Sequence, residues 1–344
     1  MNVRYLTSSY DSKIARIQAI DAPLNLIFIT DAHNDLSDGD RQHSAIPIVE
    51  SMHYVLEHCP KIACVVNGGD NGNDYHPDPK EYRRSICEFL EALYRLPVPV
   101  HNCIGNHDDR LGNCHANGWD TRTAILPKEM HEICMKNNPT PENYYYTDID
   151  TDERGYRLAF LNTSDFPCYP DETGQIPIDR GEISTKQAEW FEQVVLPTNR
   201  KILVFSHVPI HAEGIYGGGI DGDISPYDDV FNAPRVYYHA KKNQNVIAMI
   251  AGHVHYDNVH IDGFLPTITT GAGYIRVWGK GVPAREPGTS SEALFDVISI
   301  KDDWMYITRF GAGTDRVVPL LRLRNTRWNC LTTNNSMTQA KRSE

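Results

Sequence analysis

The sequence lacks paired cysteines, a long apolar run and an apolar leader. Its eight cysteines are scattered over 344 residues without any Cys-x-x-Cys pair, which argues against a disulfide framework and favours free thiols in a reducing compartment. No window approaches the roughly 20 apolar residues of a membrane span, and residues 1–20 contain no apolar core of signal-peptide length. We therefore expect a cytoplasmic protein with no membrane partner.

Basic residues are also scarce relative to acidic ones. The chain has 33 Lys and Arg against 45 Asp and Glu, a net charge of -12, and such a field repels nucleic acid. The remaining composition, 40% hydrophobic and 23% charged, excludes a disordered or coiled-coil chain. A chain of this length buries enough core to fold without a structural metal, so metal-binding residues would serve another purpose.

The hydrophobic pattern predicts an α/β fold. Near the N-terminus, apolar runs typical of strands alternate with amphipathic stretches typical of helices. A helix that connects two strands in this way makes them parallel neighbours in the sheet. A Ser184/Gln187 pair is typical of a helix start. No linker divides the chain, so we expect one domain over residues 1–324 and a polar tail over residues 325–344. The predicted strands are 24–30, 62–67, 98–104, 144–149, 156–162, 202–205, 246–251, 293–299 and 305–310, and the predicted helices are 46–59, 79–96, 185–196 and 234–242.

Residues that can bind metal ions follow five of these strands. In an open α/β sheet the carboxyl ends of strands line one crevice, so the five clusters are expected to converge. Each motif alone is weak evidence, because Asp and His at a strand end are more often a turn cap and a surface imidazole. Their ordered combination favours a single site. The clusters are Asp31 and His33; Asp70; Asn106, His107 and Asp108; His207; and His253 and His255.

The donor types suit a binuclear centre. Carboxylate, amide and imidazole groups are present without thiolate, and a bridging carboxylate can hold two divalent ions about 3.5–4 Å apart. Glycines directly precede Asp70, Asn106 and His253, as expected where the backbone approaches the ions closely. In an extended Asp-x-His or His-x-His segment, residues two apart point the same way, so both side chains could face the ions.

This ordered set resembles the calcineurin-like metallophosphoesterase superfamily over about residues 24–274. The resemblance implies a four-layer αββα sandwich, two mixed β-sheets flanked by helices, rather than the doubly wound sheet that periodicity alone favours. The hairpin at residues 144–162 and the C-terminal strands would then build the second sheet. It also implies an enzyme that hydrolyses phosphate esters by direct attack of a metal-bridging hydroxide, without a covalent phosphoenzyme.

The resemblance also assigns roles residue by residue. Asp70 would bridge the two ions, His107 would be the acid that protonates the leaving group, and Asp108 would orient His107. The ions would be divalent Mn, Fe, Zn, Co or Ni. One ion would be held by Asp31, His33, Asp70 and His255, and the other by Asp70, Asn106, His207 and His253.

One departure narrows the expected substrate. The chain reads Asn71-Gly72-Asn73-Asp74 after Asp70, whereas the protein Ser/Thr phosphatases of the superfamily resemble Gly-Asp-x-Val-Asp-Arg-Gly there. Because the arginine that clamps phosphate in that branch is missing, a protein Ser/Thr phosphatase is not expected. A phosphate mono- or diester of a small molecule or nucleotide suits the acidic charge of the chain. The alternatives are a metal-dependent nuclease, which the net charge disfavours, and a non-catalytic interaction module, which would be free to lose ligands that this chain retains.

Other polar residues near these motifs have simpler explanations. His115 and His211 fall in loops expected to rim the site, and Cys103 is interpreted as a buried strand thiol. Residues 215–225 lack the Lys-Ser/Thr ending of a P-loop, so they are either a lid or a connector. Arg276 and Trp278 are first interpreted as the edge of a sheet, with a phosphate and base platform as the alternative.

Overall fold

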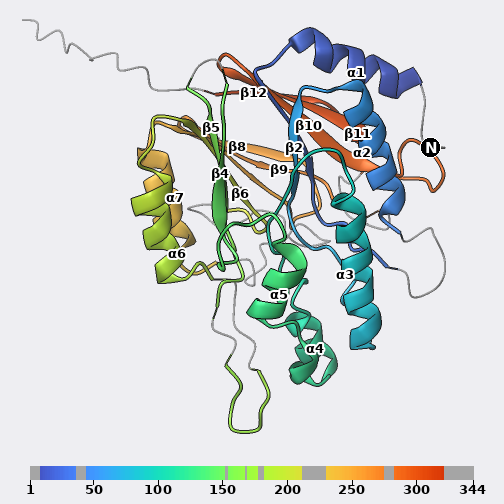
Figure 1. Cartoon of the computed structure of the whole chain (residues 1–344), viewed down its shortest axis with the longest axis vertical. Helices are drawn as coiled ribbons and strands as arrows, with labels where there is room; N and C mark the ends of the chain where they lie inside the picture. Colours follow the sequence, from blue (N-terminus) through green and yellow to red (C-terminus); the bar gives the residue numbers. More distant parts are fainter. Residues whose placement is uncertain are drawn as a thin grey trace, which may run out of the picture.

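Two six-stranded sheets pack face to face and helices cover their outer sides (Figure 1). The computed structural model describes residues 8–35, 44–151, 154–166, 169–176, 182–210, 230–274 and 283–320. The four-layer αββα architecture with two mixed sheets is therefore confirmed. The predicted tail, residues 215–225, His211, Arg276 and Trp278 lie outside the described residues.

The first sheet has the order β12-β11-β10-β1-β2-β3. Strands β1, β2 and β3 are parallel, as the crossover helices predict, whereas β10 pairs antiparallel with the free side of β1. The C-terminal strands β10 to β12 thus extend the first sheet, and the expectation that they build the second sheet was wrong. The bounds are β1 Leu24–Ile29, β2 Ile62–Asn67, β3 Val100–Asn102, β10 Leu294–Lys301, β11 Trp304–Gly311 and β12 Arg316–Pro319.

The second sheet has the order β4-β5-β6-β7-β9-β8. The predicted hairpin is present as β4 and β5, and β5, β6, β7 and β9 are parallel neighbours. The carboxyl ends of β6 and β7 therefore point the same way. The bounds are β4 Tyr145–Ile149, β5 Tyr156–Phe160, β6 Lys201–Ser206, β7 Val246–Ala251, β8 Asn258–Asp262 and β9 Leu265–Thr269.

Helices cover both outer faces. Helices α1 (Ser8–Ile20), α2 (Ile46–His58) and α3 (Pro79–Leu93) lie against the first sheet, and α6 (Thr185–Trp190) and α7 (Ala233–Lys242) lie against the second (Figure 1). Two short helices follow β3, α4 at Leu111–Asn117 and α5 at Pro127–Cys134.

Helix starts follow the local sequence. The Ser184 side chain accepts a hydrogen bond from the Gln187 backbone N–H at the start of α6, as predicted. Beyond Trp190 the helix continues as one π-helical turn over Phe191–Val195, so the predicted single α-helix is interrupted. Within the described residues, no helix combines the length and the apolar character that a membrane span needs.

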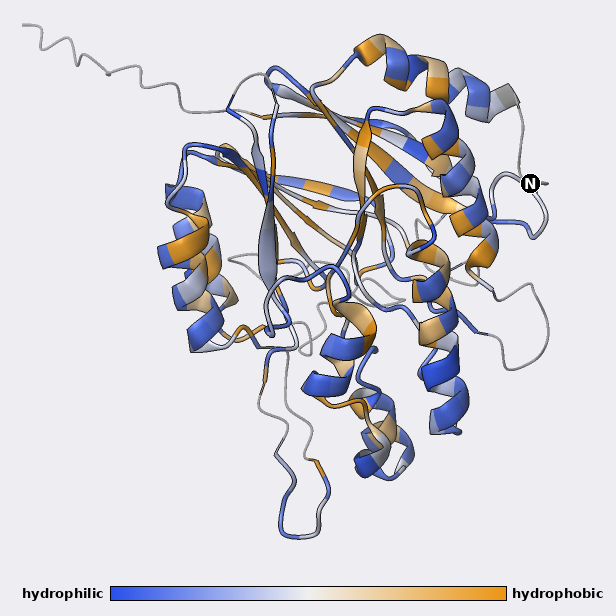
Figure 2. Ribbon diagram, in the orientation of Figure 1, coloured by the Kyte–Doolittle hydropathy of each residue, from blue (hydrophilic) through white to orange (hydrophobic). Residues whose placement is uncertain are grey.

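The core lies between the two sheets and beneath each helical layer. Strand β6 is buried on both faces: Leu203 and Phe205 join the core between the sheets, while Ile202 and Val204 join the core under α6 and α7. Figure 2 shows apolar residues concentrated on the strands and on the inner sides of the helices. A strand buried on both faces fixes its register strongly, and this rigidity carries to the turns at its end.

Candidate metal centre

The five predicted clusters meet at the carboxyl ends of β1, β2, β3, β6 and β7. Three of these strands belong to the first sheet and two to the second, so the site lies at the shared edge of both. The turns after β1 and β2 are joined beyond the strands, because the backbone N–H of Asp31 donates to Gly69 O and that of His33 donates to Asp70 O, each at 2.9 Å. The hydrogen bonding between β1 and β2 therefore continues into the turns that follow these strands, and it holds the first two clusters in place.

The candidate ligands sit in strained turns rather than in extended backbone. Nine non-glycine residues have a positive φ in the described part of the chain, and five of them are candidate ligands. The expected extended alternation in Asp31-x-His33 and His253-x-His255 is therefore not the geometry found. Such conformations cost free energy and persist where the surroundings impose them, which is common at functional sites. The five φ values are 53° for Asp31, 39° for His33, 55° for Asp70, 70° for His253 and 60° for His255.

Two glycines allow the turns after β2 and β3 to touch. Gly69 has φ of +95°, and a Cβ there would lie 2.5 Å from Gly105 N. A Cβ on Gly105 would lie 2.2 Å from Asp70 N. Both positions need glycine because backbone lies where the side chain would be, as the sequence predicted.

The first group of candidate ligands comprises Asp31, His33, Asp70 and His255. Their donor atoms all lie within 4.8 Å of one another. His255 Nε2 is 3.1 Å from Asp31 Oδ1 and 3.3 Å from His33 Nε2, and His33 Nε2 is 3.6 Å from Asp70 Oδ2. Two imidazole nitrogens and two carboxylates thus converge on one point.

The second group comprises Asp70, His207 and His253, whose donor atoms also lie within 4.8 Å of one another. His207 Nε2 is 3.2 Å from Asp70 Oδ2. Asn106 completes the group, because its Oδ1 is 2.9 Å from His207 Nε2 and 2.8 Å from His253 Nδ1. The Nδ1 of His207 is 2.9 Å from Gly68 O, which orients the ring. Asp70 is common to both groups.

The electrostatics of the two groups suit divalent cations. Asp31 and Asp70 are buried, and within the described residues neither forms an ion pair with a lysine or arginine. Asp70 Oδ2 is buried and accepts no hydrogen bond. Burial lowers the pKa of His207, but the charges of Asp70 and Asp31 outweigh it and raise the pKa to about 9. A buried orphan carboxylate oxygen among imidazoles fits bound cations, with oxygen and nitrogen donors appropriate to Mn, Fe, Zn, Co or Ni.

His107 lies beside these groups and is paired with Asp74. The distance from His107 Nδ1 to Asp74 Oδ2 is 2.9 Å, and the Asp74 side chain is fully buried. The backbone N–H of His107 donates to Asp70 Oδ1 at 2.9 Å. Burial lowers the pKa of His107, but the charges of Asp70 and Asp74 outweigh it and hold the pKa well above its usual value. The arrangement favours a protonated imidazole.

Asp108 does not orient His107, which corrects that expectation. Its carboxylate accepts hydrogen bonds from the backbone N–H groups of Gly105 at 2.8 Å, Asn71 at 2.7 Å and Asp70 at 3.1 Å. These bonds turn Asp108 inward and tie the turn after β2 to the turn after β3. Sequence reasoning missed Asp74, and its only signal was an acidic residue four positions after Asp70.

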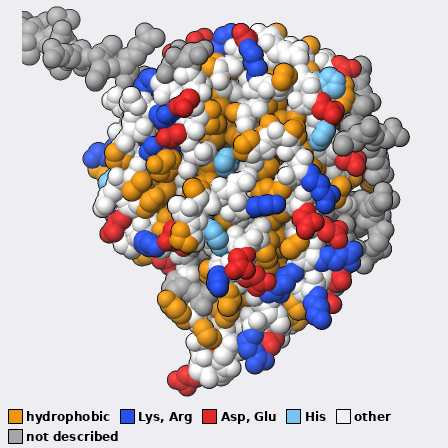
Figure 3. Space-filling view, in the orientation of Figure 1, with side chains coloured by type: hydrophobic (Ala, Val, Ile, Leu, Met, Phe, Trp, Pro, Cys, Tyr) orange, Lys and Arg blue, Asp and Glu red, His pale blue; other side chains and the backbone are white. Residues whose placement is uncertain are grey.

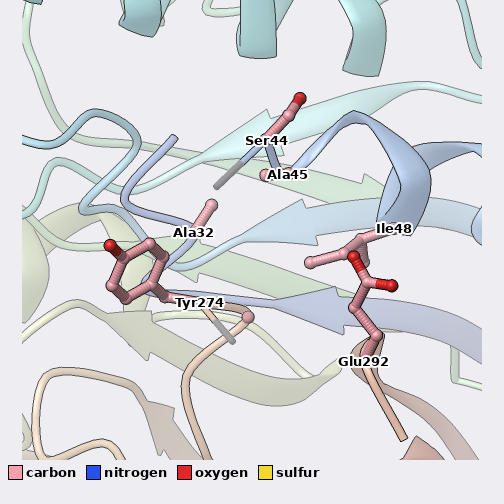
Figure 4. A pocket seen from close by; sticks show the side chains of 7 residues that line it. Ala32, Ser44, Ala45, Ile48, Tyr274 and Glu292 are labelled. Atoms are coloured by element: carbon pink, nitrogen blue, oxygen red, sulfur yellow. The ribbon is translucent and has the colours of Figure 1, made fainter. Parts of the chain in front are cut away.

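The other residues considered near the site have structural contacts. His115 Nε2 lies 2.9 Å from Ile176 O, and Cys103 is buried at the end of β3. A cavity of about 10 Å³ lies beside the turn after β1, which is close to the room of one water molecule. In Figure 4, Ala32 and Tyr274 lie at one side of this cavity and Ile48 and Glu292 at the other.

Comparison with known proteins assigns the class. The family model described as calcineurin-like phosphoesterase matches residues 24–257, more than half of the chain. The chain therefore belongs to this family, and it is a hydrolase that acts on phosphate ester bonds. A sequence search among curated proteins found no significant match.

Solved structures of low sequence identity share the fold. A dimetal phosphatase from Danio rerio has a TM-score of 0.57 and 16% identity, covering 88% of this chain and 100% of that chain. GAP50, described as the anchor in the inner membrane complex of Plasmodium, has a TM-score of 0.52 and 15% identity, covering 88% and 90%. The purple acid phosphatase PPD1 from yellow lupin (Lupinus luteus) has a TM-score of 0.53 and 12% identity, covering 86% and 53%.

Proposed function

We propose that the protein hydrolyses phosphate mono- or diesters of small molecules or nucleotides at a centre for two divalent cations. The observation that carries the proposal is the pair of donor groups that share buried Asp70, with His107 directly beside them. When bound, the two cations would supply Lewis acidity to activate water and balance the charge of the phosphoryl group. No phosphorylated side chain is required.

The two donor groups would divide the cations as the family resemblance implies. Asp31, His33 and His255 would hold one ion, His207, Asn106 and His253 the other, and Asp70 both. Rigid turns support this role, because ligands held in place need no rearrangement to bind an ion.

His107 would protonate the leaving-group oxygen. Its Nδ1 is engaged by Asp74, so Nε2 is the ring nitrogen available to a substrate, and the side chain is 28% exposed. A departing alkoxide is a poor leaving group unless it receives a proton, and a positioned acid contributes about 10²- to 10⁴-fold to such a step. Asp74 would keep the imidazole protonated and fix its direction.

The alternatives fit the observations less well. A nuclease needs a basic track for the phosphate backbone, but the net charge is -12 and basic and acidic side chains are interspersed on the face shown in Figure 3. A non-catalytic module would gain nothing from strained, buried ligands and a His107–Asp74 pair.

A substrate panel with His107 variants tests the proposal. With manganese present, the protein should hydrolyse a chromogenic bis-ester or mono-ester faster than single-stranded DNA. His107→Gln should reduce turnover of esters with poor leaving groups about 10²- to 10⁴-fold with unchanged metal content. His115→Gln is the matched control, because that imidazole bonds the backbone of Ile176. Activity on DNA alone, or full activity of His107→Gln, would refute the corresponding part of the proposal.

A further inference from the structure

An exposed aromatic ring stands beside the candidate acid. Tyr75 directly follows Asp74, and 65% of its surface is exposed. Its ring centroid is 6.3 Å from that of His107, with an angle of 33° between the two planes. A tyrosine exposed beside the candidate acid offers an aromatic face against which a ligand can pack.

The segment that carries Tyr75 is held on its C-terminal side by a buried arginine. Arg110 is 1% exposed, and its Nη2 donates to His76 O at 2.8 Å and Pro77 O at 2.7 Å. Its guanidinium also lies 4.8 Å from the Trp119 ring centroid. A guanidinium that donates two hydrogen bonds to successive carbonyls fixes the backbone just after Tyr75.

The N-terminal side of the same segment is held as well. Asn73 donates from its backbone N–H to Asn34 O at 3.2 Å and from Nδ2 to Asp35 Oδ2 at 2.8 Å. Asp74 is anchored by His107. The backbone around Tyr75 is therefore fixed on both sides. Little conformational entropy of this segment is then lost when a ligand packs against the ring.

The position of Tyr75 determines which part of a substrate it can meet. His107 would donate its proton to the leaving-group oxygen, so the group attached to that oxygen must lie on the side of His107. Tyr75 is on that side, and a tyrosine face stacks well only on a planar group. A flexible alkyl group would gain little from it.

We propose that Tyr75 is a stacking platform for the leaving group, so that the enzyme prefers phosphate esters whose leaving group carries a planar ring, aryl or nucleoside. This inference rests on the proposed function and narrows its substrate class. Stacking of a base on one aromatic side chain contributes about 5- to 100-fold to binding, and an exposed platform with one free face falls at the low end, about 5- to 20-fold.

The kinetic test compares leaving groups of similar acidity. Phenyl phosphate and hexafluoroisopropyl phosphate release alcohols that ionise at similar pH, so a rate difference reports recognition rather than intrinsic reactivity. The wild-type protein and Tyr75→Phe should favour the phenyl ester about 5- to 20-fold in kcat/KM, and Tyr75→Leu should lose that preference. Tyr238→Leu, which removes an exposed tyrosine on α7, is the control and should behave as wild type.

A binding test separates this inference from the proposed function. The dissociation constants of phenylphosphonate and methylphosphonate are measured by calorimetry with the manganese-loaded protein and the same variants. The phenyl compound should bind about 5- to 20-fold more tightly to wild type and Tyr75→Phe, but not to Tyr75→Leu. If no ester is hydrolysed while this Tyr75-dependent difference persists, the proposed function fails and the platform stands. If Tyr75→Leu keeps the phenyl preference in both tests, or wild type has none, the platform is refuted.

Discussion

In the described part of the chain, two clusters of largely buried acidic residues differ in the positive charges that face them. In the first cluster, buried Asp296 and half-buried Asp257 are matched by arginines: Arg309 Nε donates to Asp296 Oδ1 at 2.7 Å and Arg309 Nη1 donates to Asp257 Oδ2 at 2.9 Å. Arg316 Nη2 also donates to Asp296, at 2.5 Å. Burial raises the pKa of Asp296, but the charges of Arg309 and Arg316 outweigh it and keep the pKa below its usual value.

The candidate metal centre has equally buried acids without such partners. Asp31 and Asp70 face imidazoles, and Asp70 Oδ2 accepts no hydrogen bond. Arginines are always charged, whereas imidazoles are charged only when protonated, so the first cluster is neutralised within the chain at every pH and the second is suited to cations from solution. The two clusters are also linked, since Asp257 follows His255 by two positions and is held by Arg309. Substitutions in the metal centre should therefore act mainly on activity, and substitutions in the arginine cluster mainly on stability.

Asp70→Asn should have the largest effect on activity. Loss of the shared carboxylate removes charge from both donor groups, so the hydrolysis rate with manganese should fall at least about 10²- to 10³-fold. In a chelator the variant should lose less stability than Asp296→Asn does, because Asp70 faces imidazoles rather than buried arginines and its Oδ2 accepts no hydrogen bond. Rates, together with thermal unfolding in a chelator, check this. A strongly lowered stability of the metal-free variant would mean that Asp70 belongs to a structural ion pair like Asp296.

Asp296→Asn should act mainly on stability. It leaves Arg309 and Arg316 buried with too little negative charge, and breaking a buried pair costs about 3–5 kcal/mol. Denaturant unfolding should show this loss, while the folded variant retains its metal ions. Unchanged stability, or loss of metal with the fold intact, would contradict the claim that the Asp296 cluster is structural and separate from the metal centre.

Asp74→Asn tests whether Asp74 acts through His107 or belongs to the metal centre itself. The amide preserves the shape but removes one of the two charges, those of Asp70 and Asp74, that raise the pKa of His107. Turnover of esters with poor leaving groups should fall about 10- to 100-fold, with little change for good leaving groups and none in metal content. The same substitution at Asp108 should instead lower thermal stability, because Asp108 binds three backbone N–H groups. Equal losses for all leaving groups would assign Asp74 to the metal centre itself.

Asp109→Asn should have the smallest effect, and it depends on pH. Burial raises the pKa of Asp109 to about 7 from an ordinary value of 3.8. The folded protein therefore binds the proton more tightly than the unfolded chain, and stability falls as the pH rises from about 4 through about 7. The neutral amide avoids this cost, so the variant should be about 1–2 kcal/mol more stable than wild type at pH 8 and nearly equal at pH 4. Thermal unfolding at both pH values measures it, and a larger gain at pH 4 would contradict it.

Much of the fold and the candidate site could be predicted because the signals are local. The strands that carry Asp31, Asp70, His207 and His253 are continuous apolar runs, and the polar residues follow them directly. The convergence of their ends then follows from parallel strand geometry. The glycines before Asp70 and Asn106 are required by backbone contacts within the same turns.

What the sequence could not provide depends on contacts between distant segments. His107 and Asp108 are adjacent in the chain, yet the Asp108 carboxylate points away from the His107 ring because it accepts hydrogen bonds from three backbone N–H groups. The imidazole of His107 pairs instead with Asp74, which lies in the turn after β2. Strand β10 pairs with β1, which no local pattern specifies. The Arg309 cluster joins β11, β10 and the segment after His255, so its members have no shared motif.

The location of bound cations tests the central claim most directly. A crystal of the wild-type protein grown with manganese should give two anomalous scattering peaks about 3.5–4 Å apart, both within coordination distance of Asp70. One peak should be flanked by His33 and His255 and the other by His207 and His253. No peak at Asp70, with manganese bound elsewhere or absent, would contradict the account.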